Sequence, residues 1–190
     1  MHLVLASASP RRAELLTSAG FTFEIAPADV DETPRAEESP ADYALRVAID
    51  KAAAAAAKQR QSGTIVLAAD TVVVADGQIL GKPADQLDAE RMLKTLSGAV
   101  HDVLTAVVLK SDSRELSEVV TTRVSVLPLG TDEIGWYIAS GEPEGKAGAY
   151  AIQGRAARFI DRIEGSWSNV VGLPIATVHK LLKELEGTIS

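Results

Sequence analysis

Apolar residues in this chain gather in short continuous runs and in stretches of helical period, and turns rich in glycine and polar residues separate them. The continuous runs are rich in Val, Ile, Leu and Phe, which is typical of strands with at least one buried face. Asp76 and Gly77 form a hairpin signal inside one of these stretches. The expected strands are residues 3–5, 21–25, two runs within 64–80, a hairpin over about 100–127, and 157–163.

The stretches of helical period begin at residues that favour helix starts. Ser9 and Ser39 each stand directly before a proline, so each is expected as an N-cap with proline in the first helical position. Gly20 and Gly98 are expected to end two of the helices. The expected helices begin at Pro10, at Pro40 (through an alanine-rich run to about Lys58), at Asp85, at Thr131, and at Leu173 or Pro174.

Two further stretches, residues 144–154 and 164–169, are rich in glycine and polar residues and are expected as loops. The mixture of helices with parallel-capable and hairpin strands predicts an α/β fold with a mixed, twisted sheet flanked by helices. At 190 residues the chain can bury one sizeable core, and it contains no linker-like run and no internal repeat. We therefore expect a single domain over residues 1–190.

Composition narrows the function classes. The chain has no cysteine, which excludes disulfides, thiolate nucleophiles and thiolate metal sites, and its three histidines have no ligand-like spacing. No apolar run reaches membrane-spanning length and the start lacks the pattern of a secretory signal, so we expect a cytoplasmic protein with no membrane partner. A net charge of −7 argues against extended nucleic-acid binding, but a local basic cluster can still capture a small anion.

Such a cluster lies in "LASASPRR", where Ser7, Ser9, Arg11 and Arg12 follow a strand and open a helix. Backbone N–H groups, hydroxyls and guanidinium groups converge on phosphate oxygens in this geometry, so the stretch predicts an anion site without a glycine-rich loop. The alternative is that Ser9 is only an N-cap and that both arginines are solvated.

Two residues are expected to carry charge into the packed part of the protein. Lys51 lies one helical turn after Val47, beside the alanines, where an unpaired ammonium is costly and needs a partner. Asp70 stands between "IVLAA" and "TVVV", so we expect it near the core at the end of a strand, paired, hydrogen-bonded or bound to metal. The alternatives are that Lys51 extends past small alanines to solvent and that Asp70 is a turn or cap residue.

Three further residues complete the candidate site. Glu32, in an acidic loop, could give Mg²⁺ a second oxygen ligand beside Asp70, although it could also be a solvated loop charge. Lys82 follows the hairpin beside a rigid proline. Gln153 offers an amide with donor and acceptor atoms, which suits the edge of a nucleotide base.

Taken together, these motifs resemble those of a known family, in the same order and over nearly the whole chain. They are "LASASPRR", "AADTVVV", "GKP", "LSG" followed by "H.V.T", "KAGAYAIQG" and "GSWSNVVGLP", and the family is the Maf family of nucleoside triphosphate pyrophosphatases. The run "KAGAYAIQG" resembles the branch that acts on dTTP and UTP, whereas the branch that acts on 7-methyl-GTP has a different sequence there. Ala151 stands where glycine is frequent in this family and Ala99 where arginine is common, which concerns local loop geometry more than function.

The resemblance implies a role for each candidate residue. Asp70 becomes the proton acceptor and, with Glu32, a metal ligand, while Lys51 and Lys82 join it in the catalytic set. The substrate-binding residues by resemblance are Ser7, Arg11, Arg12, Thr71 and Gln153, of which Arg12, Thr71 and Gln153 bear on substrate choice. The family fold is an elongated α/β structure, like that of inosine triphosphatases, with a nucleotide-binding cleft beside a mixed sheet, and it is commonly a homodimer.

We therefore expect hydrolysis of dTTP and UTP, with CTP or modified pyrimidine nucleotides as further substrates, to the monophosphate and pyrophosphate. Water activated by Asp70, directly or through Mg²⁺ or Mn²⁺, would attack the α-phosphorus, and no covalent intermediate is required. The resemblance also implies clearance of unwanted nucleotides and a link to cell-division arrest. Two alternatives remain open: a pyrophosphatase for 7-methyl-GTP or another purine nucleotide, and a regulator of division that binds nucleotide without turnover.

Overall fold

The computed structural model describes residues 2–187, and the chain divides into two compact units. Unit 1 contains the described residues up to Asp70, then Thr105–Val120 and those from Gly172 onward. Unit 2 contains Thr71–Leu104 and Thr121–Val171. The chain passes from one unit to the other within three long strands, so each unit holds part of each of these strands, and it passes back once more between Val171 and Gly172.

The strands form one seven-stranded mixed sheet, in the order β2-β1-β3-β5-β6-β7, with β4 paired to β3. Strand β1 is parallel to both β2 and β3, whereas β4 is antiparallel to β3 and β7 is antiparallel to β6. This arrangement confirms the predicted α/β fold with a mixed sheet. The strands are β1 (His2–Leu5), β2 (Glu24–Ile25), β3 (Thr64–Ala75), β4 (Gln78–Leu80), β5 (Val100–Lys110), β6 (Glu115–Val126) and β7 (Ile160–Glu164).

Helices from both the beginning and the end of the chain belong to unit 1, and the remaining helices belong to unit 2. Those of unit 1 are α1 (Pro10–Ser18), α2 (Pro40–Ala56) and α6 (Ile175–Leu185). Those of unit 2 are α3 (Gln86–Leu96), α4 (Thr131–Ala139), α5 (Trp167–Val171) and two 3-10 helices, η1 (Ala147–Ala149) and η2 (Arg155–Phe159).

Four expectations from the sequence are corrected. Strand β2 is only two residues long, because the N–H of Phe21 bonds the Leu16 carbonyl at the end of α1 instead of a neighbouring strand. The two runs expected in residues 64–80 are one continuous strand up to Ala75, so Asp70 lies in mid-strand and not at a strand end. Residues 155–159 form η2 and not the first part of β7. Residues 167–171 form a short helix and not a loop, since Ser166 Oγ accepts the N–H of Asn169.

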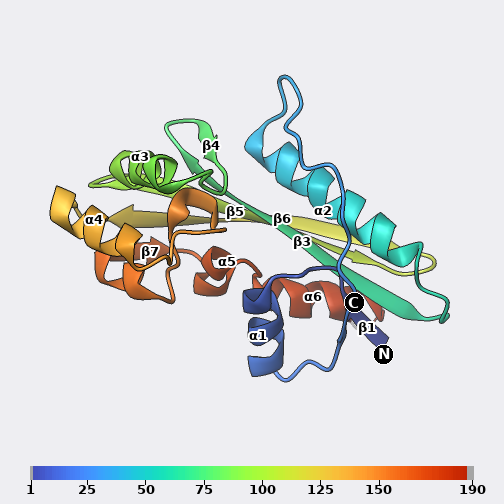
Figure 1. Ribbon diagram of the computed structural model, residues 1–190. Helices are drawn as coiled ribbons and strands as arrows, with labels where there is room; N and C mark the ends of the chain where they lie inside the picture. The colour runs from blue at the N-terminus through green and yellow to red at the C-terminus, as the bar shows by residue number, and fades with distance from the viewer. Residues whose placement is uncertain (1, 188–190) are drawn as a thin grey trace. The chain divides into compact units, whose positions relative to one another are not determined.

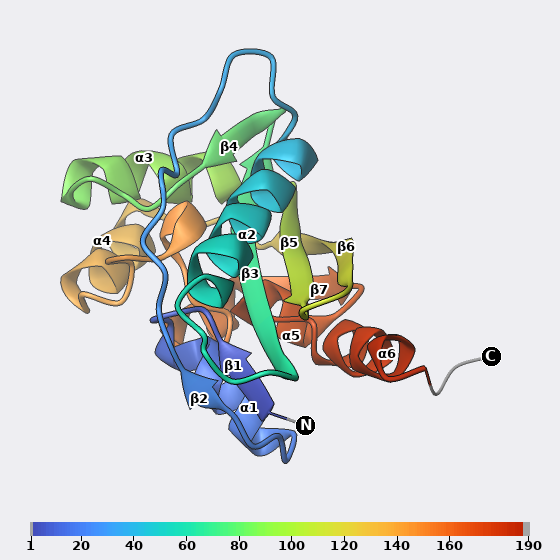
Figure 2. The ribbon, with the colours of Figure 1, turned by 90° about the vertical axis from the view of Figure 1, so that its right-hand side faces the viewer.

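In unit 1, helices pack on both faces of the sheet. Figure 1 shows α2 above the strands of this unit and α1 and α6 below them, and Figure 2 shows α2 running along β3. On β3, Leu67 and Ala69 belong to the apolar cluster shared with α1 and α6. Side chains alternate along a strand, so Ala68, which lies between them, and Asp70, which follows them, point to the opposite face, which α2 covers.

The close packing of α2 on this face follows from its alanines. The α2 residues that are fully buried are Ala44, Val47, Ala48, Ala52 and Ala55. Small side chains let a helix approach the sheet closely, and Ser39 holds the start of α2 by accepting the N–H of Asp42 at 3.1 Å. A long side chain among these alanines is therefore directed at the strand below, which is the position of Lys51.

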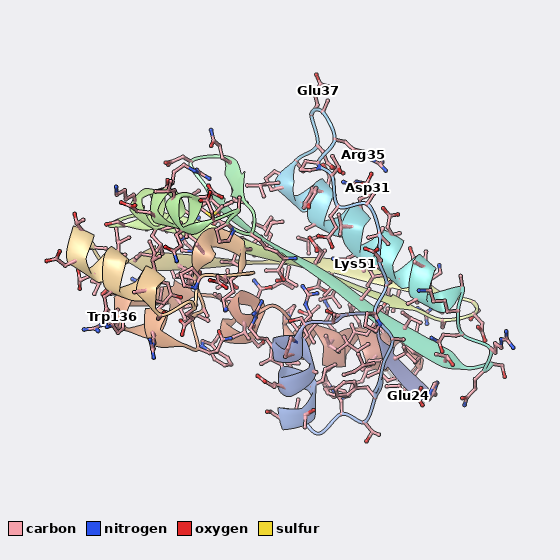
Figure 3. All side chains as sticks on the ribbon, in the orientation of Figure 1. Glu24, Asp31, Arg35, Glu37, Lys51 and Trp136 are labelled. Atoms are coloured by element: carbon pink, nitrogen blue, oxygen red, sulfur yellow. The ribbon has the colours of Figure 1, made fainter. Side chains whose placement is uncertain are left out.

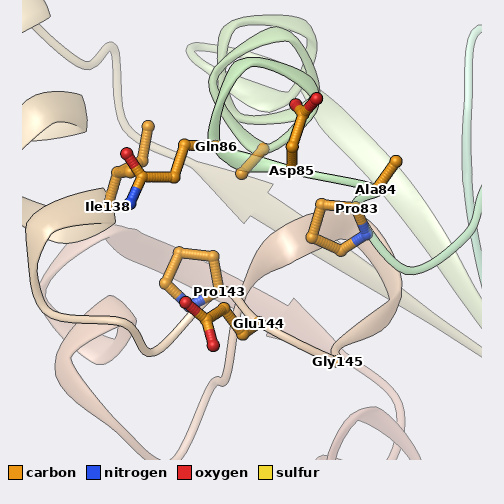
Figure 4. Close-up of a pocket in the computed structure, with 9 residues that line it drawn as sticks. Pro83, Ala84, Asp85, Gln86, Ile138, Pro143, Glu144 and Gly145 are labelled. Carbon is orange, nitrogen blue, oxygen red and sulfur yellow. The ribbon is translucent and has the colours of Figure 1, made fainter.

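In unit 2, α3 packs against α4 and against η1. A pocket of about 410 Å³ opens where the start of α3 meets the segment after α4. Figure 4 shows Pro83 and Pro143 on its walls, with the Gln86 side chain between the two segments. Unit 2 also contains a buried histidine. His101 on β5 is 2% exposed, and its Nε2 lies 2.8 Å from the Tyr150 hydroxyl.

The burial of His101 predicts a dependence of stability on pH. Burial lowers the pKa of His101 to about 4, and Nδ1 has no hydrogen-bond partner among residues 2–187. Because the unfolded-state pKa is near 6.5, the folded protein loses stability as pH falls from about 6.5 to about 4, by roughly 3 kcal/mol in total. Urea unfolding at pH 7.5 and 4.5 measures this loss.

In His101→Gln, most of the predicted loss of stability at low pH should disappear, because glutamine does not titrate. His179→Gln, which replaces an exposed histidine on α6, is the matched control and should keep the wild-type loss. Equal losses in wild type and in His101→Gln would show that His101 does not couple folding to protons.

Candidate active site

The centre of the candidate site is a carboxylate in the middle of a strand. Asp70 lies on β3, on the face covered by α2, and is only 8% exposed. Its Oδ1 accepts a hydrogen bond of 2.8 Å from the Lys51 ammonium. Burial raises the pKa of Asp70, and the positive charges of Lys51 and Arg12 oppose that rise. Asp70 is therefore a carboxylate with increased affinity for a proton, held in place by an ion pair.

Lys51 connects this carboxylate to a second one. It lies one turn after Val47 on the buried side of α2 and is 9% exposed, and Figure 3 shows it on the side of the helix that faces β3. Its Nζ is 2.8 Å from Asp70 Oδ1 and 2.6 Å from Glu32 Oε1. Lys51 thus has the partners that its burial requires, and one ammonium holds two carboxylates close together.

The loop that carries Glu32 is held by α2. The Tyr43 hydroxyl donates to the Glu32 carbonyl at 2.8 Å. Arg46 donates to both carboxylate oxygens of Glu38, at 2.6 and 2.9 Å, and to the Thr33 carbonyl at 3.1 Å. The hydrogen bonds from Arg46 lower the pKa of Glu38 to about 2. The loop extends beyond α2 only near Glu37, at its tip in Figure 3, whereas its Glu32 end is fixed.

Tyr43 and Arg46 are site residues that the sequence reasoning missed. Tyr43, Val47 and Lys51 are spaced four residues apart and therefore share one face of α2. A polar hydroxyl on the same helical face as a buried lysine was the available signal, and it indicates a polar site rather than a plain core.

Arg12 is buried and bonded to the main chain of two distant segments. Its Nε donates to the Gly172 carbonyl and its Nη1 to the Ala69 carbonyl, both at 2.8 Å, and Nη1 also donates to Ser7 Oγ at 3.1 Å. Burial lowers the pKa of Arg12, and the nearby Asp70 charge opposes that shift. The alternative that Arg12 is only a solvated side chain is wrong, because Arg12 is 8% exposed. It ties α1 to β3 and to the segment before α6, and its contact with substrate stays a prediction.

The start of α1 keeps the features of an anion site. Ser9 occupies the N-cap position, but its side chain makes no capping hydrogen bond. Ser7 Oγ accepts the N–H of Ser9 at 3.2 Å, so this hydroxyl shapes the turn before the helix. The Arg11 side chain is partly exposed and makes no hydrogen bond or ion pair with another residue of the described chain. The guanidinium of Arg11 and the positive end of α1 are therefore presented together.

The other three predicted residues lie in unit 2, and the structure ties their segments together. Thr71 stands on β3 two residues before Val73, and Gly148 packs so closely on Val73 that an added Cβ would lie 2.9 Å from it. The N–H of Gly148 donates to the Gly81 carbonyl at 3.0 Å, directly before Lys82. One body therefore carries Thr71, the Lys82 loop and the segment that leads to Gln153. Both Lys82 and Gln153 are exposed.

The sequence-predicted set thus falls into two groups. Ser7, Arg11, Arg12, Glu32, Lys51 and Asp70 belong to unit 1, and Thr71, Lys82 and Gln153 to unit 2. The structure brings Asp70, Lys51, Glu32 and Arg12 into direct or near contact. That both groups act on one substrate stays a prediction.

The donor atoms of the first group fit a hard divalent cation. Glu32 and Asp70 already flank one positive charge, the Lys51 ammonium, with oxygens at 2.6 and 2.8 Å. Within residues 2–187, no group of three or more His, Cys, Asp or Glu side chains could enclose a metal ion. Mg²⁺ binds through one or two carboxylates together with phosphate oxygens and water, so two carboxylates are sufficient only when a phosphate is present.

None of the helices in the described part of the chain is both long and apolar enough to cross a membrane.

Comparison with solved structures supports the fold. The Ham1 protein of Staphylococcus aureus superposes with a TM-score of 0.54 at 14% identity, and the match covers 100% of both chains. At this identity the similarity concerns the fold alone.

Sequence comparison identifies the family. The family model described as "Maf-like protein" matches residues 2–185. The dTTP/UTP pyrophosphatase of Geobacter metallireducens is 51% identical over 186 residues, covering 97% of this chain and 96% of that protein. The dTTP/UTP pyrophosphatase of Anaeromyxobacter dehalogenans is 52% identical over 186 residues, covering 96% and 93%. By both measures, this chain belongs to the Maf family.

Proposed function

We propose that this protein is a nucleoside triphosphate pyrophosphatase that hydrolyses dTTP and UTP to the monophosphate and pyrophosphate. The observation that carries the proposal is the buried carboxylate of Asp70, paired with Lys51 beside the start of α1. The names of relatives about half identical over nearly the whole chain support the pyrimidine substrates. The family resemblance supports two further parts of the proposal, that residues 1–190 act as one catalytic domain and that the protein is a cytoplasmic homodimer.

In the proposed reaction, Asp70 takes a proton from water while the water oxygen attacks the α-phosphorus. The bond between the α-phosphorus and the α,β-bridging oxygen breaks, and pyrophosphate leaves with the electron pair. Burial favours the protonated product state of Asp70, and the Lys51 ammonium keeps the resting carboxylate ionised. Arg11 and Lys82 supply positive charge for the phosphates, and Gln153 contacts the base.

Glu32 and Asp70 would hold a divalent metal in this scheme, because their oxygens are the hard ligands that Mg²⁺ and Mn²⁺ prefer. When bound, such an ion stabilises the negative charge that develops on the phosphate oxygens. The fixed position of the Glu32 carbonyl on the Tyr43 hydroxyl keeps this loop near Asp70 for that purpose.

The two alternatives are less well supported. The relatives named above carry dTTP and UTP in their names, which favours pyrimidine over 7-methyl-GTP or other purine substrates. A regulator that only binds nucleotide has no need of a carboxylate beside like-charged phosphates, whereas a hydrolase needs a base there.

Removal of metal tests the first part of the mechanism. Chelation with EDTA is expected to abolish pyrophosphate release from dTTP, and Mg²⁺ or Mn²⁺ is expected to restore it. Glu32→Gln should raise the Mg²⁺ concentration that gives half-maximal activity, because an anionic ligand becomes neutral. Glu24→Gln, which changes an exposed carboxylate paired with His2, is the control. Full turnover in metal-free buffer would contradict the mechanism.

Asp70→Asn tests the general base. Asparagine keeps the size of the side chain but cannot accept the proton, so kcat should fall by about 10²–10⁴-fold. Nucleotide affinity should stay similar or improve, because a negative charge near the phosphates is gone. Pyrophosphate release, nucleotide binding and the melting temperature are measured on the same preparation.

Asp76→Asn is the matched control for this substitution. Asp76 lies in the hairpin turn at the end of the same strand, and its φ of 49° is a conformation that asparagine also tolerates. This variant should keep wild-type kcat. If Asp70→Asn folds, binds nucleotide and turns over at near the wild-type rate, then Asp70 is not the base.

Gln153→Ala tests base recognition. The ratio of kcat/KM for dTTP to that for dATP should fall, because a lost contact to the base costs about 1–3 kcal/mol when its partner is left unpaired. Gln59→Ala truncates a glutamine of unit 1, outside the unit that carries Gln153, and should leave the ratio unchanged. An unchanged ratio in Gln153→Ala would remove Gln153 from base readout.

A further inference from the structure

Gln153 lies at the exposed tip of a tight turn whose ends are held in an unusual way. The turn runs from Ala151 to Gly154 and closes with a hydrogen bond of 3.0 Å from the Gly154 N–H to the Ala151 carbonyl. Ile152 within it is buried, whereas Gln153 is exposed. On each side of the turn, backbone N–H groups donate to side chains from α4 and the segment directly after it.

Tyr137 of α4 holds the first end of the turn. It is fully buried and packs edge-to-face on Phe159, with ring centroids 5.8 Å apart. Its hydroxyl accepts the N–H of Ala151 at 3.1 Å and donates to Glu142 Oε1 at 2.8 Å. Both functions of a hydroxyl are thus used, so the position of the Ala151 backbone depends on that of Glu142.

Glu142 holds the second end of the turn. Its Oε2 accepts the N–H of Arg155 at 3.0 Å, and its Oε1 accepts the N–H of Ala156 at 3.4 Å, so this carboxylate caps η2. Burial raises the pKa of Glu142, but the donors from Arg155, Tyr137 and Ala156 outweigh burial and leave the pKa below its usual value. The carboxylate therefore remains an acceptor throughout the neutral range.

The glycine of the turn fits this close contact. A Cβ added to Gly154 would lie 2.4 Å from Glu142 Oε2, which no side chain can occupy unless the carboxylate moves. The carboxylate thus lies directly against the backbone that follows Gln153. The family often has glycine at the position of Ala151. The Ala151 backbone is not in the left-handed region, so alanine fits this position without strain.

We propose that Tyr137 and Glu142 are positioning residues that fix the direction of the Gln153 side chain and so set the preference for pyrimidine nucleotides. This inference rests on the proposed function, in which Gln153 contacts the base. Tyr137 accepts the N–H of Ala151, the first residue of the turn, and Glu142 accepts the N–H of Arg155, the residue directly after it. Neither end of the turn can therefore move without breaking a hydrogen bond to a buried or charged group. A glutamine amide distinguishes bases only if its oxygen and nitrogen are held in a fixed orientation.

Other anchors keep the rest of the segment in place when this pair is altered. Tyr150 is hydrogen-bonded to His101 at 2.8 Å, and Gly148 is bonded to Gly81 at 3.0 Å. Both bonds lie before the turn and involve neither Tyr137 nor Glu142. Changes to the pair should therefore loosen the turn without releasing the whole segment.

The experiment compares Tyr137→Phe and Glu142→Gln with the wild-type protein. Phenylalanine keeps the ring and its contact with Phe159, so this variant retains the packing of α4. Glutamine keeps the size of Glu142, but its NH₂ group cannot accept a hydrogen bond. One of the two side-chain atoms that accept backbone N–H groups in the wild-type protein is therefore lost as an acceptor. For each variant, kcat and KM are measured for dTTP and for dATP, and the ratio of the two kcat/KM values is taken on one preparation. The amount of active protein cancels in that ratio, so partial unfolding does not change it.

The dTTP-to-dATP ratio is expected to fall about tenfold in each variant, mainly through KM for dTTP, while kcat at saturating dTTP changes less than twofold. The matched control is Glu133→Gln, which changes a carboxylate of α4 that also accepts a backbone N–H, but that of Gly130, at 2.9 Å. Its ratio should equal that of wild type. Equal ratios in wild type, Tyr137→Phe and Glu142→Gln would overturn the proposal, even if both variants melt at lower temperature.

A second arm tests whether the pair acts through Gln153. In the Gln153→Ala background, Glu142→Gln should lower the ratio no further, because the side chain that the pair positions is already absent. A further drop of the same size would show that the pair acts on something other than Gln153 and would overturn the proposal. A wild-type protein that hydrolyses neither nucleotide would instead contradict the proposed function, so the two failures are distinguishable.

Discussion

The ion pair between Lys51 and Asp70 determines how unit 1 is built around its site. A carboxylate in the middle of a buried strand is tolerated only with a partner, and the partner must come from the element that covers that face. Helix α2 provides it because its alanines let the helix lie close to β3, while the Lys51 side chain on the same face reaches Asp70 at 2.8 Å. The same ammonium binds Glu32 at 2.6 Å, so the acidic loop is also drawn to this point.

Unit 2 carries the exposed candidate side chains Lys82 and Gln153, which the proposed function needs in fixed directions. Here the backbone is anchored instead of the functional side chains. Gly148 contacts Val73 and bonds Gly81, and the turn around Gln153 is bonded to Tyr137 and Glu142. An exposed amide or ammonium loses much conformational entropy on binding a ligand, and a fixed backbone lowers that cost.

The sequence predicted the parts of the fold that depend on local pattern. The strand expected at residues 3–5, the helix starting at Pro10, the alanine-rich helix, and the hairpin of β5 and β6 all follow from periodicity and caps. What local pattern could not show is where side chains from distant segments meet. The turn at Asp76 and Gly77 was a local signal, but β3 runs unbroken through Asp70 between β1 and β5, and pairing with strands so distant in sequence has no local signal. Likewise, the sequence left open whether Arg12 binds an anion or is solvated, because its three acceptors, Ser7, Ala69 and Gly172, are brought together only by the tertiary structure.

The charges of the candidate site also explain how a protein with a net charge of −7 can attract a triphosphate. In the core of the site, the two carboxylates of Glu32 and Asp70 are balanced by two cations, Lys51 and Arg12, so this cluster by itself neither attracts nor repels an anion strongly. Attraction has to come from groups whose charge is not already paired, and near the start of α1 the Arg11 guanidinium and the positive end of the helix are such groups. A buried ion pair adds little to stability compared with an apolar core, so stability alone gives no reason for charged groups in the middle of β3. In the proposed reaction, Asp70 accepts the proton inside this balanced cluster, and the unbalanced positive charge at the start of α1 attracts the polyanion.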